Sequence, residues 1–252
     1  PAGASISLIF TMFVMVTSAI HSWFRGWAPA IILILLLSFN FLSQYDFLTP
    51  PNKAYGLNYD NLPAQITPET IQNKLNKENY QKDSLHTINI LEKWKIKNTI
   101  KDKKPKMVFI NTTGGGMRSA LWSFCAIQYC DSILNGKLLR QTQLISGSSG
   151  GLIGLAYLRE LMLREKRNEI SNFHESNYRN DMAKDILNKV AFYVSVNDML
   201  LRLQTFEDNG FTYRKDRGYA FEKQLNVNTR GYLNRRLSEY YTPEYNSEIP
   251  ML

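Results

Sequence analysis

The segment from Met107 to Arg164 constrains the fold most, because short apolar runs alternate there with glycine-rich turns and helical patterns. The first apolar run precedes three consecutive glycines, and the second precedes Gly147-Ser148-Ser149-Gly150-Gly151. This order is typical of strand, loop, helix, strand, turn and helix. Two such units form a right-handed crossover between parallel strands. The pattern therefore predicts an α/β domain with a mainly parallel sheet flanked by helices.

The same segment predicts the individual elements. Val108, Phe109 and Ile110 are typical of a buried strand, and Gln143–Ser146 of a second one. Helices are expected over Arg118–Leu134 and Leu152–Arg164, and Gly136 should end the first. The first helix carries an apolar stripe made of Leu121, Cys125, Ala126, Tyr129 and Ile133.

Ser149 occupies the centre of a G-x-S-x-G pattern. In this kind of turn a serine lies on a sharp bend between strand and helix, so that its hydroxyl projects from the sheet. Gly147 and Gly151 allow the strained backbone path. With glycine at about 7% of average sequence, the pattern occurs by chance in roughly one chain of this length in twelve, so its context matters. Ser149 is the predicted nucleophile, and a purely structural turn is the alternative.

The glycines one unit upstream meet a second requirement of acyl transfer. That reaction needs donors directed at the oxygen that becomes negative, and backbone N–H groups at a helix start can supply them. We expect Gly114, Gly115, Gly116 and Met117 to form this oxyanion hole. The dipole of the helix that follows Ser149 should also favour negative charge there.

These two motifs together resemble the patatin-like phospholipase family, which is itself similar to the catalytic core of cytosolic phospholipase A2. The resemblance covers about residues 106–252 and implies that a Ser–Asp dyad, without histidine, cleaves lipid acyl esters. It implies Ser149 as nucleophile, Gly115 and Gly116 as oxyanion donors, and Arg118 as a substrate-binding arginine. A structural ion pair is the alternative role for Arg118.

The sequence departs from the family pattern at three points. Thr113 and Ser119 stand where the family often carries Asp and Gly. The family's catalytic Asp lies in an Asp-Gly-Gly or Asp-Gly-Ala motif, but no Asp in this chain precedes Gly. We expect the base downstream of Leu252, because Ile249–Leu252 is typical of another strand's beginning. The alternative substitutes, each more typical of a capping or surface carboxylate, are Asp198, Asp208 and Asp216.

The first 48 residues are typical of membrane sequence. Residues 1–24 and Gly26–Tyr45 carry no charge, and each stretch is long enough to cross a hydrocarbon layer of about 30 Å as a helix. Trp23, Trp27 and Tyr45 mark the ends of these stretches. We predict a two-helix transmembrane hairpin in a multi-pass integral membrane protein, with two buried core helices as the alternative. Few flanking charges bear on orientation, and the expected side of the catalytic domain is the cytoplasm.

Residues 49–105 are expected to form a connector. Thr49-Pro50-Pro51 should stop the second apolar helix, and Thr67 should cap a helix over Pro68–Tyr80. Seven lysines and one aspartate lie in Lys93–Lys106, which could contact anionic lipid or form a solvated linker. Residues 106–252 then form the N-terminal part of the patatin-like domain.

The remainder of that domain has weaker patterns. Helical spacing extends over Asn180–Gln204, and two further helices are predicted over Ala220–Leu225 and Arg230–Tyr241. Between them, Phe206–Gly218 is typical of a loop or hairpin, either near the acyl site or as ordinary core aromatics.

The composition of the chain limits the kinds of molecule that it is expected to bind. The net charge of +8 favours an anionic partner, and next to the apolar segment a lipid bilayer fits this best. No zinc-finger, P-loop or RNA-binding motif supports nucleic acid. Cys125 and Cys130 lie about 140° apart on a helix, so they should be unpaired and buried. His21, His86 and His174 are isolated, which favours a dyad over a triad.

The sequence thus predicts a membrane-associated serine hydrolase of lipid acyl esters, of the phospholipase A or lysophospholipase type. No metal or organic cofactor is expected, and the oligomeric state is open. An acyltransferase on the same fold and an inactive membrane scaffold are the alternatives.

Overall fold

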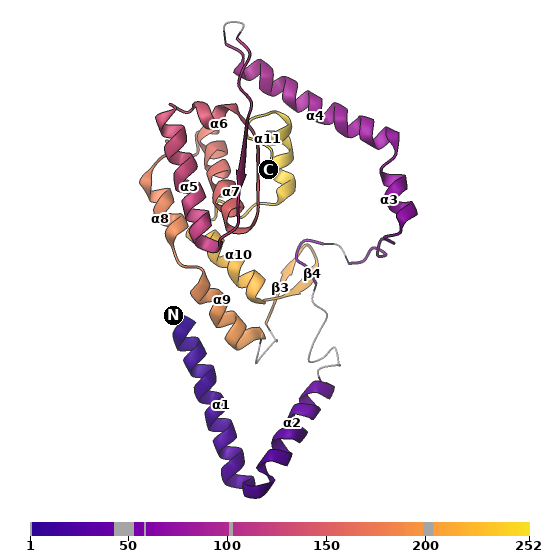
Figure 1. The fold of residues 1–252 in the computed structure, drawn as a ribbon, viewed down its shortest axis with the longest axis vertical. Helices are drawn as coiled ribbons and strands as arrows, with labels where there is room; N and C mark the ends of the chain where they lie inside the picture. Colours follow the sequence, from indigo (N-terminus) through magenta and orange to yellow (C-terminus); the bar gives the residue numbers. More distant parts are fainter. Residues whose placement is uncertain (1, 43–52, 58, 101–102, 199–203) are drawn as a thin grey trace. The chain divides into compact units, whose positions relative to one another are not determined.

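The computed structural model describes residues 2–42, 53–57, 59–100, 103–198 and 204–252. The described chain is mostly helical, with a small parallel sheet and a separate β-hairpin (Figure 1). It divides into two compact units, one made of Pro1–Pro63 and Asp185–Leu225, the other of Ala64–Lys184 and Asn226–Leu252. The predicted domain limits after residues 48 and 105 stay predictions.

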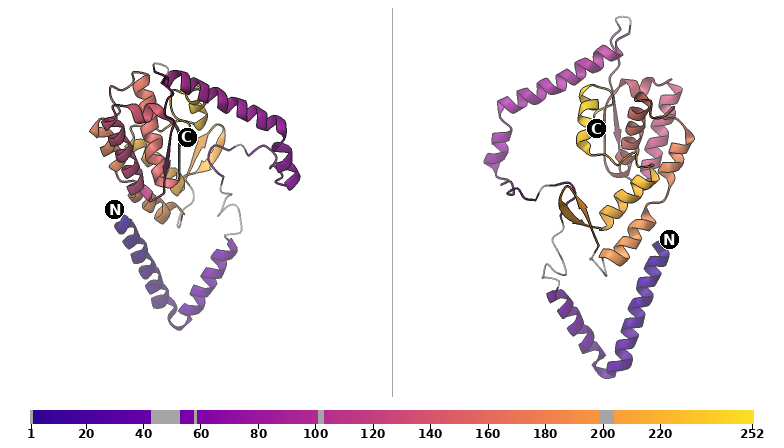
Figure 2. Two further views of the ribbon diagram at one scale, coloured as in Figure 1. Left: turned by 45° about the horizontal axis from the view of Figure 1, so that its top comes forward. Right: turned by 180° about the vertical axis from the view of Figure 1, so that it is seen from behind.

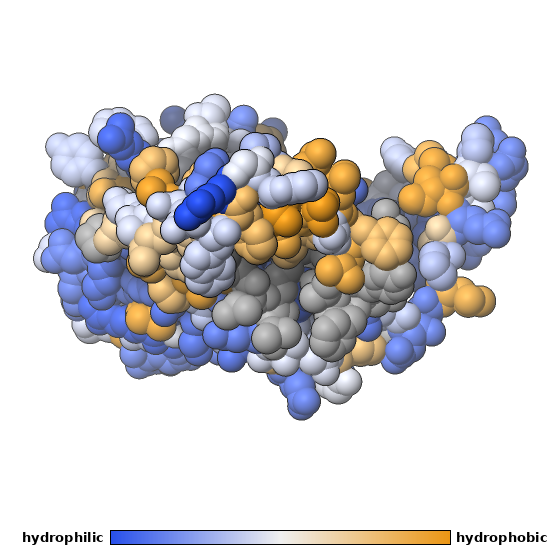
Figure 3. Space-filling view, turned by 90° about the horizontal axis from the view of Figure 1, so that it is seen from below, coloured by the Kyte–Doolittle hydropathy of each residue, from blue (hydrophilic) through white to orange (hydrophobic). Residues whose placement is uncertain are grey.

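The first unit begins with an apolar helical segment. It comprises α1 (Ala2–Phe24), a short 3-10 turn η1 (Arg25–Trp27) and α2 (Ala28–Leu42). Gly3–Leu42 is long and apolar enough to cross a membrane, and its most apolar stretch is not buried. Figure 3, viewed from the side where α1 and α2 meet, shows apolar side chains at the surface. The predicted helix end at Tyr45 and the Thr49-Pro50-Pro51 stop lie outside the described residues.

Both threonine hydroxyls within α1 are satisfied by the helix's own backbone. Thr11 donates to the Ser7 carbonyl at 2.8 Å, and Thr17 donates to the Phe13 carbonyl at 2.9 Å. In hydrocarbon an unsatisfied hydroxyl is costly, and this bond to the preceding turn avoids that cost. These polar residues are therefore compatible with an apolar surrounding.

The rest of the first unit combines short helices with a hairpin. α9 (Leu187–Tyr193) continues into a π-helical turn η2 (Val194–Asp198). Residues 184–186 before α9 are not helical, so the helical pattern over Asn180–Gln204 is not one element, and residues 199–203 of it lie outside the described chain. β3 (Thr205–Asp208) pairs antiparallel with β4 (Phe211–Arg214), and α10 (Arg217–Asn228) follows. Asn209 and Gly210 both have positive φ, as a two-residue hairpin turn requires. Of the two structures predicted for this region, a hairpin forms.

The second unit contains the parallel sheet. β1 (Val108–Thr112) pairs in parallel with β2 (Thr142–Gly147), and Ile110 lies opposite Ile145. Met251 adds one parallel bridge on the other side of β2, where its N–H donates to the Gln143 carbonyl at 3.0 Å. The parallel pairing was predicted, but in the described chain the sheet has only these two strands and that bridge.

Two helices pack on the sheet and on each other. α5 (Gly116–Ile133) follows β1 and α7 (Ser149–Lys166) follows β2, and the two run side by side (Figures 1 and 2). The smaller α6 (Lys137–Gln141) and α8 (Ser176–Ala183) connect and cover them. α5 ends at Ile133, and Asn135 and Gly136 follow with positive φ, so that the Gly136 N–H donates to the Asp131 carbonyl at 2.9 Å. The predicted helix end before Gly136 is confirmed. The core between these elements is formed mainly by Ile110, Ala120, Phe124, Ile145, Leu155, Leu158, Leu161 and Tyr178.

The predicted apolar stripe of α5 is only partly its buried face, since Leu121 and Cys125 pack against the core while half-buried. Tyr129 and Ile133 are exposed, and the helix instead buries Ala120, Ser123, Phe124, Gln128 and Asp131. The polar members of this face have partners, since Gln128 donates to the Phe173 carbonyl and Asp131 accepts from the Leu139 N–H, each at 2.8 Å. The fully buried face of α5 therefore includes hydrogen-bonded polar side chains that the apolar pattern does not contain.

Two side chains expected to be buried lie at the surface. Phe109 is 64% exposed because one face of β1 is uncovered in the described chain. Cys130 is exposed on the outer face of α5, while Cys125 is half-buried, and both are free thiols as predicted. Burial raises the pKa of the Cys125 thiol.

Two other predicted helices are interrupted. Thr67 and Pro68 begin α3 (Pro68–Lys74) as expected, but Asn76 then caps a new helix, α4 (Lys77–Asn98). Pro68–Tyr80 is therefore not one helix. The predicted helix Arg230–Tyr241 is also wrong, because Arg230 and Gly231 adopt positive φ and end α10. Only a 3-10 turn η3 (Leu237–Tyr240) and α11 (Tyr241–Tyr245) form there.

Buried charges on α7 hold this C-terminal segment. Glu160 is fully buried, and its carboxylate pairs with Arg164 at 2.7 Å and Arg235 at 3.1 Å. The same carboxylate accepts the Tyr240 hydroxyl at 2.8 Å. Burial, and then the charge of Glu160, raise the pKa of Tyr240, so the phenol keeps its proton as donor.

Glu160→Gln should lower the free energy of unfolding by about 3 kcal/mol, because two arginines would then face each other without their buried counter-charge. The measurement is urea unfolding of the detergent-solubilised chain, followed by tryptophan fluorescence. Glu239→Gln is the matched control, since Glu239 is half exposed and lies 3.9 Å from Arg235. Equal losses in the two variants would contradict the role given to Glu160.

Candidate active site

Ser149 lies at the junction of β2 and α7. β2 ends at Gly147, Ser148 is extended, and α7 begins at Ser149 with a φ of +50°. A residue with a Cβ atom rarely adopts this left-handed conformation, which costs about 1–3 kcal/mol. It is the strand-to-helix bend that a G-x-S-x-G nucleophile requires. The Ser149 side chain is exposed.

Glycines around Ser149 are required by close backbone contacts. A Cβ atom at Gly147 would lie 2.6 Å from the Thr112 carbonyl oxygen, and one at Gly151 would lie 2.4 Å from the Thr113 carbonyl oxygen. At Gly150 the distance to the Gly116 carbonyl oxygen would be 1.9 Å. No side chain fits at these three positions, so the turn presses directly against the end of β1 and the loop after it.

The glycine loop lies next to the serine. A Cβ atom at Gly114 would have the Ser149 Cβ as its nearest neighbour, at 3.2 Å. Gly116, with a φ of +60°, begins α5 and faces open space. The Ser119 hydroxyl closes the loop by donating to the Thr113 carbonyl at 2.8 Å. The structure thus brings together the two motifs that the sequence analysis singled out.

Helix geometry determines which donors are available near Ser149. The first N–H groups of α5, at Gly116, Met117 and Arg118, have no acceptor one turn earlier in the helix. Gly114, Gly115 and Gly116 are exposed, and Met117 is half-buried. The positive ends of α5 and α7 also converge on this point, which favours negative charge there.

Arg118 is exposed near the start of α5. Within the described chain its guanidinium forms no hydrogen bond or ion pair. The alternative of a structural ion pair is therefore not supported by the described residues. The guanidinium can contact an anionic group in solution.

The Asp131–His174 pair lies elsewhere in the second unit. His174 Nε2 is 3.2 Å from Asp131 Oδ2, and Asp131 is fully buried near the C-terminal end of α5. Gly116 begins the same helix, and the 15 residues between it and Asp131 span about 22 Å. His174 is therefore held far from the glycine loop, which argues against a Ser-His-Asp triad.

No carboxylate is hydrogen-bonded to the Ser149 hydroxyl in the part of the chain that the structure describes. The three aspartates considered as substitute bases belong to the first unit. Asp216 caps α10, accepting the Tyr219 N–H at 2.9 Å, as expected for a capping carboxylate. Asp208 ends β3 and Asp198 ends η2.

The described residues contain no group of three or more His, Cys, Asp or Glu side chains that could hold a metal ion. No protein-family model, curated protein or solved structure matches this chain. The likeness to patatin-like phospholipases therefore rests on the two motifs and their order.

Sequence reasoning missed a part of this site, the contact that sets the distance between α5 and α7. A Cβ atom at Gly154 would lie 2.1 Å from the Ala120 carbonyl oxygen. Gly150 and Gly154 are four residues apart, so they share one face of α7 and let α5 approach. The four-residue spacing of these two glycines is the sequence signal that could have predicted this contact.

Gly154→Ala should separate α5 from α7 and destabilise the second unit by about 1–3 kcal/mol, as overpacking does. The shift in urea midpoint checks this. Gly3→Ala is the control, because a Cβ atom there meets nothing within 4 Å in α1. An unchanged midpoint in Gly154→Ala would show that the helices are not in the contact described.

Proposed function

We propose that the chain is a membrane-associated serine hydrolase of lipid acyl esters, of the phospholipase A or lysophospholipase type. The observation that carries the proposal is the left-handed conformation of Ser149 directly beside the Gly114 backbone. A strained, exposed serine next to free helix-start N–H groups suits nucleophilic attack on a carbonyl. The motif resemblance to patatin-like phospholipases supports the choice of a lipid ester.

In the proposed reaction the Ser149 oxygen attacks the ester carbonyl, and its proton passes to a carboxylate, the role that the resemblance assigns to an aspartate. The negative oxygen of the tetrahedral intermediate accepts hydrogen bonds from the N–H groups of Gly115, Gly116 and Met117. Its collapse breaks the ester bond, and the leaving alcohol takes up the proton. Water then attacks the acyl-serine, releasing a fatty acid and restoring the Ser149 hydroxyl.

Arg118 is proposed to bind the anionic part of the lipid. Its guanidinium carries a permanent charge and presents several donors to a phosphate. Arg118 is two residues after Gly116 at the start of α5. A lipid whose anionic group binds Arg118 would therefore have its ester close to the proposed oxyanion hole.

We further propose that α1 and α2 form a transmembrane hairpin in a multi-pass protein, with the catalytic domain at the cytoplasmic face. The apolar, unburied segment Gly3–Leu42 and the exposed tryptophans near its turn support the hairpin, whereas the cytoplasmic side follows from the sequence expectation alone. The substrate is then a lipid of the same bilayer.

An inactive membrane scaffold is the second candidate, because the Ser149 hydroxyl has no base within hydrogen-bond distance in the described chain. An acyltransferase would use the same nucleophile and differ only in the acceptor of the acyl group. Adding a long-chain alcohol to the assay separates it from a hydrolase, since a transferase then forms the alkyl ester instead of free fatty acid.

A fluorophosphonate probe should label the full-length protein at one site, and Ser149→Ala should abolish the labelling, because the probe needs an activated serine oxygen. Intact-mass spectrometry and gel fluorescence measure it. His174→Ala is the matched control and should label within about twofold of the unaltered protein, since a far imidazole contributes little to the barrier. Normal labelling of Ser149→Ala would remove this serine from its role.

Topology can be tested with a membrane-impermeant maleimide on sealed vesicles. Starting from Cys125→Ser and Cys130→Ser, the single-cysteine variants Gly3→Cys and Gly26→Cys should react from opposite sides, because a hairpin places its turn across the bilayer from its ends. Restored Cys130 should react from the same side as Gly3→Cys. Reaction of all three from one side would contradict the hairpin.

A further inference from the structure

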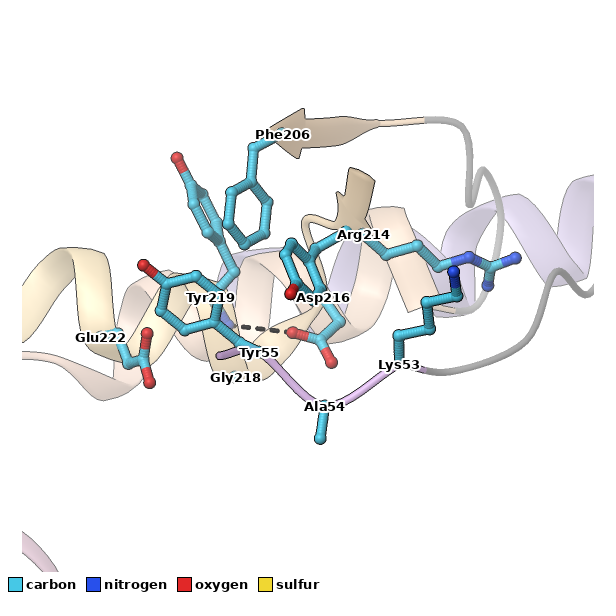
Figure 4. Close-up of a pocket in the computed structure, with 10 residues that line it drawn as sticks. Lys53, Ala54, Tyr55, Phe206, Arg214, Asp216, Gly218, Tyr219 and Glu222 are labelled. Carbon is cyan, nitrogen blue, oxygen red and sulfur yellow. Dashed lines mark hydrogen bonds between the residues drawn. The ribbon is translucent and has the colours of Figure 1, made fainter. Parts of the chain in front are cut away.

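A cavity of about 140 Å³ lies within the first unit. It is formed by the loop after the membrane segment, the β3–β4 hairpin and the start of α10, and is lined by Lys53, Ala54, Tyr55, Phe206, Tyr213, Arg214, Asp216, Gly218, Tyr219 and Glu222 (Figure 4). Drug-sized ligands occupy pockets of roughly 300–1,000 Å³. This one suits a smaller group, of the size of a lipid headgroup.

Aromatic rings surround one end of the cavity. The Tyr55 ring packs edge-on against Phe206 at 5.5 Å and against Tyr213 at 5.4 Å, and Tyr219 lies 4.6 Å from Phe206. The Tyr213 hydroxyl donates to the Leu57 carbonyl at 3.3 Å, which ties the loop to the hairpin. Several ring faces at different angles around one space form the cage that binds quaternary ammonium groups.

Two carboxylates accompany these rings. Glu222 lies at the aromatic end in Figure 4, and Asp216 lies between that end and the other. Burial, and then the charge of Asp216, raise the pKa of Glu222. Two acidic groups that repel each other are stabilised by a cation placed near them.

The opposite end of the cavity is basic. Lys53 and Arg214 extend on the same side in Figure 4, away from Glu222. Two cationic groups that share one side of a cavity attract a phosphate, which a guanidinium can bind through two donors. The cavity is therefore positive at one end, and acidic and aromatic at the other.

We propose that this cavity binds a phosphocholine group. The trimethylammonium lies against Tyr55, Phe206 and Tyr219 beside Glu222, and the phosphate lies against Lys53 and Arg214. A zwitterion with its charges at opposite ends matches the charge order of the site, whereas choline or phosphate alone matches one half. The cavity follows the apolar segment in sequence, where a lipid headgroup is the available source, and free phosphocholine is the other.

The test uses the full chain carrying Ser149→Ala in maltoside micelles, so the result is independent of the proposed hydrolysis. Isothermal titration with phosphocholine, choline and inorganic phosphate should show the tightest binding for phosphocholine. Tyr55→Ala should weaken phosphocholine and choline at least tenfold, because a ring face is lost. Tyr55→Phe keeps the ring and should bind as before.

Further variants test the two ends of the cavity separately. Glu222→Gln should weaken choline binding, and Lys53→Ala should weaken phosphocholine binding without affecting choline. Inorganic phosphate binding as tightly as phosphocholine, or Tyr55→Ala leaving choline affinity unchanged, would overturn the proposal. Nanodiscs then distinguish the sources: competition by phosphatidylcholine but not phosphatidylglycerol identifies a membrane lipid, and no competition by either identifies the soluble headgroup.

Discussion

The close contact between α7 and the loop before α5 is the constraint on which the rest of the second unit depends. Gly147 and Gly151 bring the turn after β2 within van der Waals distance of the end of β1, and Gly150 brings it equally close to Gly116 at the start of α5. The same contact places Ser149 beside Gly114 and aligns the N-terminal ends of two helices at one point. The same glycines thus set both the packing of α7 against the glycine loop and the electrostatics at Ser149. Only residues without a side chain allow the two backbone segments to come this close.

Away from that contact, buried charges hold the chain together. Glu160 and Arg159 lie next to each other on α7, and each pairs with a residue of the C-terminal segment. Arg159 also donates to the Pro250 carbonyl at 3.1 Å, immediately before Met251 joins the edge of β2. A paired charge tolerates burial where an isolated one does not. The last strand-like residues are therefore held beside the sheet by side chains of α7.

The first unit is held together by aromatic side chains instead. Its aromatic cluster is assembled from a loop, a hairpin and a helix, and the Asn-Gly turn between β3 and β4 sets which rings face one another. Phe206 lies opposite Tyr213 in that register. The proposed headgroup cavity and the proposed acyl site thus lie in separate compact units, and each can be tested without the other.

Local sequence alone determined the order of strand, glycine loop and helix around Ser149, the cap at Thr67 and Pro68, and the apolar character of Gly3–Leu42. These features depend on backbone sterics, capping and hydropathy within a few residues of each other. Short sequence patterns are therefore enough to predict them. Only the tertiary structure decided which face of α5 is buried, because Gln128 and Asp131 find partners far along the chain, at Phe173 and His174. It also decided that His174 pairs with Asp131 and that Gly154 meets Ala120, since both contacts join residues that no local pattern relates.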